Sequence, residues 1–78
     1  MDNKAFDCAK RYLKHNDRIL VFLKYTKYPT EGYYQDDRYD NKLLMKLDND
    51  SMFEVAINQV RSIFVTRGGK TLKWKNTR

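Results

Sequence analysis

The sequence predicts one mainly β domain spanning residues 1–78, built as a small five-stranded barrel with an N-terminal helix as its cap. Three observations favour this fold. Apolar and polar residues alternate with a period of two through much of the second half of the chain, as in half-buried strands. Turn signals, above all Gly68-Gly69, separate these segments, and the clearest helical pattern stands at the N-terminus. Short strands joined by tight turns, with one helix, close most economically as a barrel.

The first element is expected to be a helix of about three turns that begins near Lys4. Asp2 or Asn3 can accept hydrogen bonds from the free amides of its first turn, and Asn16 suits a left-handed exit. The apolar residues expected on its buried face recur at helical spacing and are Ala5, Cys8, Ala9, Tyr12 and Leu13.

The next element is expected to be a strand over residues 18–28, because this segment is rich in β-branched and aromatic residues and has a nearly continuous apolar centre. Pro29 lacks a backbone donor and should end the strand. Residues 29–41 are then expected to form one long loop, rich in tyrosine and in acidic residues. A loop of this length in so small a domain is usually functional or partly disordered.

The segment 52–65 carries the densest apolar pattern and is expected to form two strands with a corner or a 3₁₀ turn at Asn58-Gln59. Its apolar residues also sit three and four apart, and Ser51 begins a capping box, so an α+β fold with a second helix over 52–66 is the alternative. The β-branched and aromatic side chains favour the strands.

Three further elements complete the expected barrel. A strand is predicted over residues 43–47, and Gly68-Gly69 is the strongest hairpin signal, because adjacent glycines permit the positive φ angles of a tight turn. In the last strand Leu72 and Trp74 should face the core, whereas Lys73 and Lys75 should face outward. Residues 76–78 are expected to be a frayed tail.

This order of one helix and five strands, with Phe53-Glu-Val-Ala-Ile-Asn-Gln-Val-Arg-Ser-Ile63 as the last strand, corner and strand, resembles the Sm-like small barrels of the SH3-like class. More loosely, it resembles Rof-type proteins, which bind the transcription terminator Rho. The resemblance implies the fold. The chain departs from the Rof type in being strongly basic, so Rho is not carried over as its partner.

Composition excludes several functional classes. The single cysteine, Cys8, rules out an internal disulfide and four-cysteine metal sites, so we expect a reducing, cytoplasmic home and no metal or other cofactor. The longest unbroken apolar run, residues 19–23, is too short to cross a bilayer, so no membrane partner is expected.

The candidate catalytic groups do not predict an enzyme. Cys8 and His15 lie about two helical turns apart, too far for a nucleophile and its base. Asp36 and Asp37 are adjacent in a loop, with nothing to hold them at a catalytic distance. Lys70 follows two glycines, but the earlier glycine of a phosphate-binding loop is missing.

Charge points to nucleic acid. The net charge is +6, and the segments 18–28 and 67–78 hold basic residues without a single acid, whereas 29–41 is acidic. In a closed barrel the first and last strands would be neighbours, which would merge the two basic segments into one stripe that attracts phosphates. The sequence therefore predicts a non-catalytic regulatory protein that binds RNA or single-stranded DNA. The residues expected to contact phosphate are Lys24, Lys27, Arg67, Lys70, Lys73 and Lys75, and those expected to stack on bases are Tyr28, Tyr33 and Tyr34.

The alternative function is a small protein-interaction module or inhibitor that docks on a larger transcription, replication or defence complex. The tyrosines of segment 29–41 suit an interface, with Asp36, Asp37 and Asp40 at its rim. Homo-oligomerisation through exposed strand edges is compatible with either function.

Overall fold

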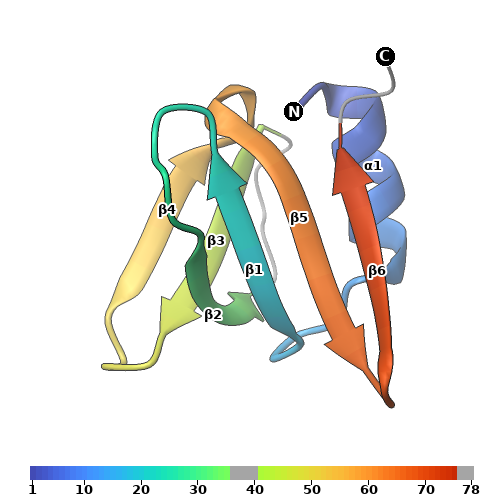
Figure 1. The fold of residues 1–78 in the computed structure, drawn as a ribbon, viewed down its shortest axis with the longest axis vertical. Coiled ribbons are helices and arrows are strands. Elements are labelled where there is room, and N and C mark those ends of the chain that lie inside the picture. The colour runs from blue at the N-terminus through green and yellow to red at the C-terminus, as the bar shows by residue number, and fades with distance from the viewer. Residues whose placement is uncertain (36–40, 76–78) are drawn as a thin grey trace.

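The computed structural model describes residues 1–35 and 41–75. Within them the chain forms an N-terminal helix and a six-stranded antiparallel sheet (Figure 1). The elements are, in order, α1 (Asn3–Tyr12), β1 (Arg18–Leu23), β2 (Thr30–Gln35), β3 (Lys42–Leu47), β4 (Met52–Ala56), the 3₁₀ turn η1 (Ile57–Gln59), β5 (Val60–Arg67) and β6 (Lys70–Lys75). The mainly β class with an N-terminal helix is thus confirmed.

Helix α1 begins where the sequence predicts. The Asp2 carboxylate accepts a hydrogen bond of 2.7 Å from the backbone N–H of Ala5. The helix ends at Tyr12 with Leu13 as an extended C-cap, so Asn16, whose φ of 72° is left-handed, lies in the following turn and is not the helix exit that was predicted. Ala5, Ala9 and Leu13 are buried as expected, but Phe6 is also fully buried and Cys8 is exposed. The prediction that Cys8 lies in the core is therefore wrong. The buried face of the helix includes the large Phe6 ring, one position after Ala5, and does not extend to Cys8.

The predicted five-stranded closed barrel is wrong. The strand order is β4-β3-β2-β1-β5-β6, so that within the described residues β4 and β6 are the two edges of an unclosed sheet. The additional strand is β2, which occupies much of the expected 29–41 loop. The first strand is correspondingly shorter than predicted and ends at Leu23, and residues 24–29 form the turn that leads into β2. Residues 36–40, which include Asp36, Asp37 and Asp40, and the expected tail 76–78 lie outside the described residues.

Strand β2 was not predicted, because Gly32 occupies an inward-facing position where an apolar side chain would have shown the two-residue period of a strand. Gly32 and Tyr34 point toward the core, and Tyr33 points outward. A Cβ added at Gly32 would meet the carbonyl oxygen of Lys46 on β3 at 2.5 Å, so the close β2–β3 pairing requires glycine at this position.

The segment 52–65 forms strands joined by a 3₁₀ turn, as expected, and the alternative helix over 52–66 is not what the chain adopts. Its turn η1 covers Asn58-Gln59, where the corner was predicted. The Gly68-Gly69 hairpin is also confirmed, with φ angles of 58° and 81°.

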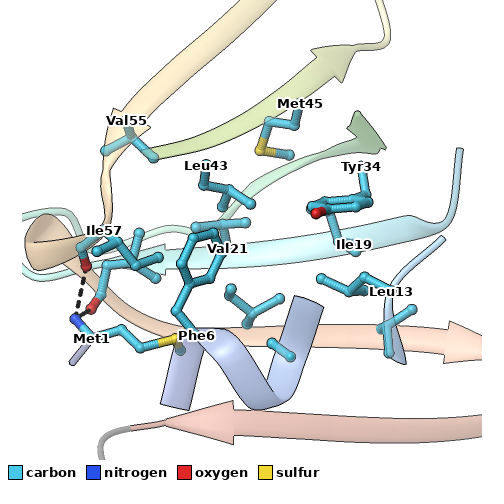
Figure 2. Close-up of a cluster of buried hydrophobic side chains, with 14 of the residues drawn as sticks. Met1, Phe6, Leu13, Ile19, Val21, Tyr34, Leu43, Met45, Val55 and Ile57 are labelled. Carbon is cyan, nitrogen blue, oxygen red and sulfur yellow. Dashed lines mark hydrogen bonds between the residues drawn. The ribbon is translucent and has the colours of Figure 1, made fainter. Parts of the chain in front are cut away.

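The core lies between α1 and the inner face of the curved sheet. Figure 2 shows that Phe6 and Leu13 from the helix segment meet side chains from the strands, including Ile19, Val21 and Leu43, which are all buried. The Met1 amine donates hydrogen bonds to the carbonyls of Ile57, at 2.9 Å, and Val60. Trp74 packs at the margin of this core with its ring centroid 5.6 Å from that of Tyr12.

Candidate nucleic-acid interface

The predicted basic residues do not form one stripe. Strand β5 separates β1 from β6, so the expectation that the first and last strands are neighbours is wrong. Lys24 and Lys27 lie in the turn after β1, at the end of the sheet where β6 also ends (Figure 1). Lys73 and Lys75 extend from the outer face of β6, whereas Lys70 stands at its beginning, at the opposite end of the sheet.

The register places an aromatic cluster on the outer face. Leu20 of β1 is opposite Phe64 of β5, Phe22 is opposite Ser62, and Lys73 of β6 is opposite Phe64. Because the intervening residues such as Val21 and Ile63 are buried against α1, these side chains face away from the core. The rings of Phe22 and Phe64 meet edge to face at 5.4 Å between centroids.

These residues enclose a shallow hollow of about 270 Å³, lined by Phe22, Arg61, Ser62, Phe64 and Lys73, which we name the aromatic hollow. A cation lies over each ring: the Arg61 guanidinium carbon is 5.6 Å from the Phe22 centroid, and the Lys73 Nζ is 5.1 Å from the Phe64 centroid. Such cation–π contacts hold positive charge beside an aromatic surface. Among the described residues, the lining carries two positive charges and no carboxylate.

A bulge explains how Arg61 reaches the outer face. Phe22 pairs with Ser62, but the next residue, Leu23, pairs with Val60, so Arg61 is the extra residue on β5. A bulge of this kind re-aims a side chain. Strict alternation would have placed Arg61 and Ser62 on opposite faces, which is why the sequence pattern did not reveal this pair.

The predicted stacking tyrosines separate into different environments. Tyr34 is only 3% exposed and belongs to the core, so its ring is not available to a base. Tyr33 is 39% exposed on the outer face of β2, with the Arg18 guanidinium 4.8 Å from its ring centroid. Tyr28 is 80% exposed in the turn after β1, where Tyr25, which was not among the predicted site residues, is also highly exposed.

Arg67 has a structural role in the described fold. Its guanidinium donates from Nε to Oδ1 of Asp17 at 3.2 Å, from Nη2 to the other carboxylate oxygen, and from Nη2 to the Tyr12 carbonyl at 3.2 Å. Burial alone would raise the pKa of Asp17, but the hydrogen bonds from Arg67 and from the Lys14 amide outweigh it, so the pKa lies below its usual value of 3.8. This ion pair leaves Arg67 poorly placed to contact phosphate.

A second cluster of charges stands beside Tyr33. Arg18 donates to Glu31 and, at 2.6 Å, to Asp48, so this guanidinium is held by two carboxylates. The hydrogen bonds from Arg18 lower the pKa of Asp48. The adjoining pocket includes Tyr33, Lys46, Asp48 and Asp50, and Lys46 is itself paired with Asp50 at 3.5 Å. The acids make this pocket less suited to phosphate than the aromatic hollow.

Lys24 lies close enough to the N-terminus to affect the pKa of the Met1 amine. Burial lowers this pKa, and repulsion from Lys24 lowers it further, partly offset by Asp2.

Neither metal chemistry nor a membrane span is indicated by the described residues. Residues 1–35 and 41–75 contain no group of three His, Cys, Asp or Glu side chains that could hold a metal ion. In the same part of the chain, no helix has the length and apolar character needed to cross a bilayer. The chain matches no protein-family model, and it matches neither a curated protein nor a solved structure.

Proposed function

We propose that this protein binds RNA or single-stranded DNA without catalysis, and that the aromatic hollow is the binding surface. The observation that carries the proposal is the juxtaposition of two aromatic rings and two cations on an open face of the sheet, contributed by three neighbouring strands. Rings that accept stacked bases beside cations that attract phosphates are the combination by which proteins bind single strands.

The electrostatics of the hollow support a polyanion. Arg61 and Lys73 flank the rings, and Lys75, opposite Ser62 in the sheet register, extends the positive surface along β6. Glu31, an acid on the outer face of β2, is paired with Arg18. Counterions released from a bound strand by these side chains would make its affinity fall with salt.

A bound base would replace one of the two cations that now lie over the aromatic rings. Neither cation makes a hydrogen bond or salt bridge to an acid among the described residues, so Arg61 and Lys73 can move from the rings to neighbouring phosphates. A base would then take their place against Phe22 or Phe64. The strand could continue toward the turn after β1, where Lys24, Lys27 and Tyr28 are exposed at the same end of the sheet.

The test compares two lysines of one strand. Affinity for a fluorescently labelled, mixed-sequence single strand is measured by anisotropy across a salt series. Lys73→Ala should weaken binding and lower the magnitude of the salt slope by about 1, because one phosphate contact is lost. Lys70→Ala, which removes the same charge from the other end of β6, is the matched control and should change little. Equal effects of both variants, or no binding at low salt, would overturn the proposal.

A protein-docking function is the second candidate, and the turn after β1 favours it. Tyr25 and Tyr28 are 68% and 80% exposed, and aromatic residues are enriched in protein interfaces. The open edges of β4 and β6 in the described sheet also offer backbone groups to a partner or to a second copy of the chain. An affinity capture from lysate separates the two functions: a partner retained after nuclease treatment, and lost with Tyr25→Ser and Tyr28→Ser together, would favour docking.

The exposed thiol of Cys8 suits a reducing compartment, so we assign the proposed activity to the cytoplasm. The fold is proposed to be a relative of the Sm-like barrels that has an open sheet.

A further inference from the structure

The hydroxyl of Ser62 lies at the floor of the aromatic hollow and makes no hydrogen bond to residues 1–35 or 41–75. Ser62 is only 6% exposed and is the buried polar residue of the described core. Among the described residues no hydrogen bond to its Oγ is present, although exposed hydroxyls such as those of Thr66 and Thr71 pair with each other at 3.0 Å. A buried hydroxyl that gives up water without gaining a partner is costly, and such groups are uncommon in native proteins.

The sheet register directs this hydroxyl into the hollow. Ser62 stands opposite Phe22 on β1 and opposite Lys75 on β6, and its side chain is on the outer face with that of Phe64. The bulge at Arg61 keeps the guanidinium on the same side, over the Phe22 ring. The hydroxyl is therefore flanked by aromatic rings, with the cations above them.

We infer that the hollow receives the edge of one unpaired nucleobase and that the Ser62 hydroxyl hydrogen-bonds to it, which makes Ser62 a residue that discriminates between bases. This inference rests on the proposed function and specifies its ligand. The volume of about 270 Å³ is below the roughly 300–1,000 Å³ of pockets that hold drug-sized ligands, so it suits one planar ring. A phosphate would pair with Arg61 and Lys73, whereas a planar base can also cover the apolar rings of Phe22 and Phe64.

The hydroxyl can donate or accept, so the base that it favours is the one that presents a matching donor or acceptor when it stacks on Phe22 or Phe64. A site built to hydrogen-bond a ligand discriminates against ligands that leave its buried polar group unpaired. The protein should therefore show a preference among bases that disappears when the hydroxyl is removed, whereas its attraction to phosphates should be unchanged.

The experiment measures the affinities of short homopolymer strands of each base, and of an abasic strand of equal length, by fluorescence anisotropy. Ser62→Ala should lower the affinity for the preferred base about tenfold, the effect of one hydrogen bond to a buried group, and should leave the abasic strand unaffected. Thr66→Ala removes a hydroxyl from the same strand and the same face, outside the hollow, and should change neither affinity.

The outcomes separate this inference from the proposed function. If the native protein binds strands but Ser62→Ala preserves every ratio between bases, the role of Ser62 is overturned and the proposed function stands. If the native protein binds no strand, both fail. A thermal melt supplies an independent check. Ser62→Ala should melt no lower than the native protein, because its hydroxyl makes no hydrogen bond within the described part of the chain. A lower melting temperature would show that the hydroxyl has a structural partner and would overturn the inference.

Discussion

Arg67 and Asp17 are fifty positions apart in the sequence and form an ion pair that fastens the segment after α1 to the end of β5. The same guanidinium lies 4.3 Å from the ring centroid of Tyr12 and bonds to the Tyr12 carbonyl. One side chain therefore satisfies a half-buried carboxylate and a carbonyl at the end of the helix. Because α1 forms one wall of the core, we expect this pair to contribute to stability.

Asp17→Asn should lower the melting temperature at neutral pH by several degrees, roughly 4–8 °C for a domain of this size. The folded state holds the pKa of Asp17 below its usual value of 3.8. The stabilisation is therefore fully present above pH 3.8, and it is lost as the pH falls through the lower folded-state pKa. Thermal melts of both proteins from neutral to acidic pH should show their difference shrinking in that acidic range.

Asp7→Asn is the matched control for this charge change. Asp7 lies on the exposed surface of α1, 4.0 Å from Lys10, and such helix-surface pairs contribute little. Its melting temperature should stay near that of the native protein. A difference between native and Asp17→Asn proteins that persists unchanged at the lowest pH would contradict the assigned role of the ion pair.

Gly32→Ala should destabilise the domain by about 1–3 kcal/mol, the usual cost of forcing extra volume into a packed site. The added Cβ would lie 2.5 Å from the Lys46 carbonyl oxygen, so β2 and β3 must move apart. Chemical denaturation monitored by Trp74 fluorescence measures the change.

Gly68→Ala provides the comparison, because its φ of 58° is strained for alanine although no described residue beyond its two chain neighbours lies within 4 Å of the new Cβ. It should cost about 1 kcal/mol, less than Gly32→Ala. If Gly68→Ala proves the more damaging of the two, the close approach of β2 to β3 is not what requires glycine at position 32.

The elements with a strong local pattern could be predicted from the sequence. The Asp2 cap, the 3₁₀ corner near Asn58 and the Gly68-Gly69 hairpin each depend on a few adjacent residues, and each is present in the structure. Strand β2 could not be recognised, because Gly32 removes one of its inward-facing side chains and the requirement for glycine comes from β3. Omitting this strand led to the wrong strand count, and the assumption of closure led to the wrong neighbours for β1 and β6.

The candidate site was harder to predict than the fold. Lys73 and Lys75 could be placed on the outer face from alternation alone. The aromatic hollow required two facts that are not local: β5 lies between β1 and β6, and a bulge brings Arg61 to the side of Ser62. The sequence held one signal for the aromatic hollow: Phe22 alternates with the buried Val21 and Leu23 along β1, which places its ring on the outer face.

The final prediction compares an outer ring with a buried one. Phe64→Leu should retain the fold, because leucine preserves most of the apolar contact of this half-buried position, and yet it should weaken single-strand binding by about 1–3 kcal/mol, the contribution of one stacked base. Tyr34→Phe should leave binding unchanged, since the Tyr34 ring lies in the core and cannot meet a base. Anisotropy titrations at one salt concentration, with circular dichroism to verify folding, measure both effects. Unaltered binding by a folded Phe64→Leu protein would show that no base stacks on Phe64 and would contradict the placement of the strand on the aromatic hollow.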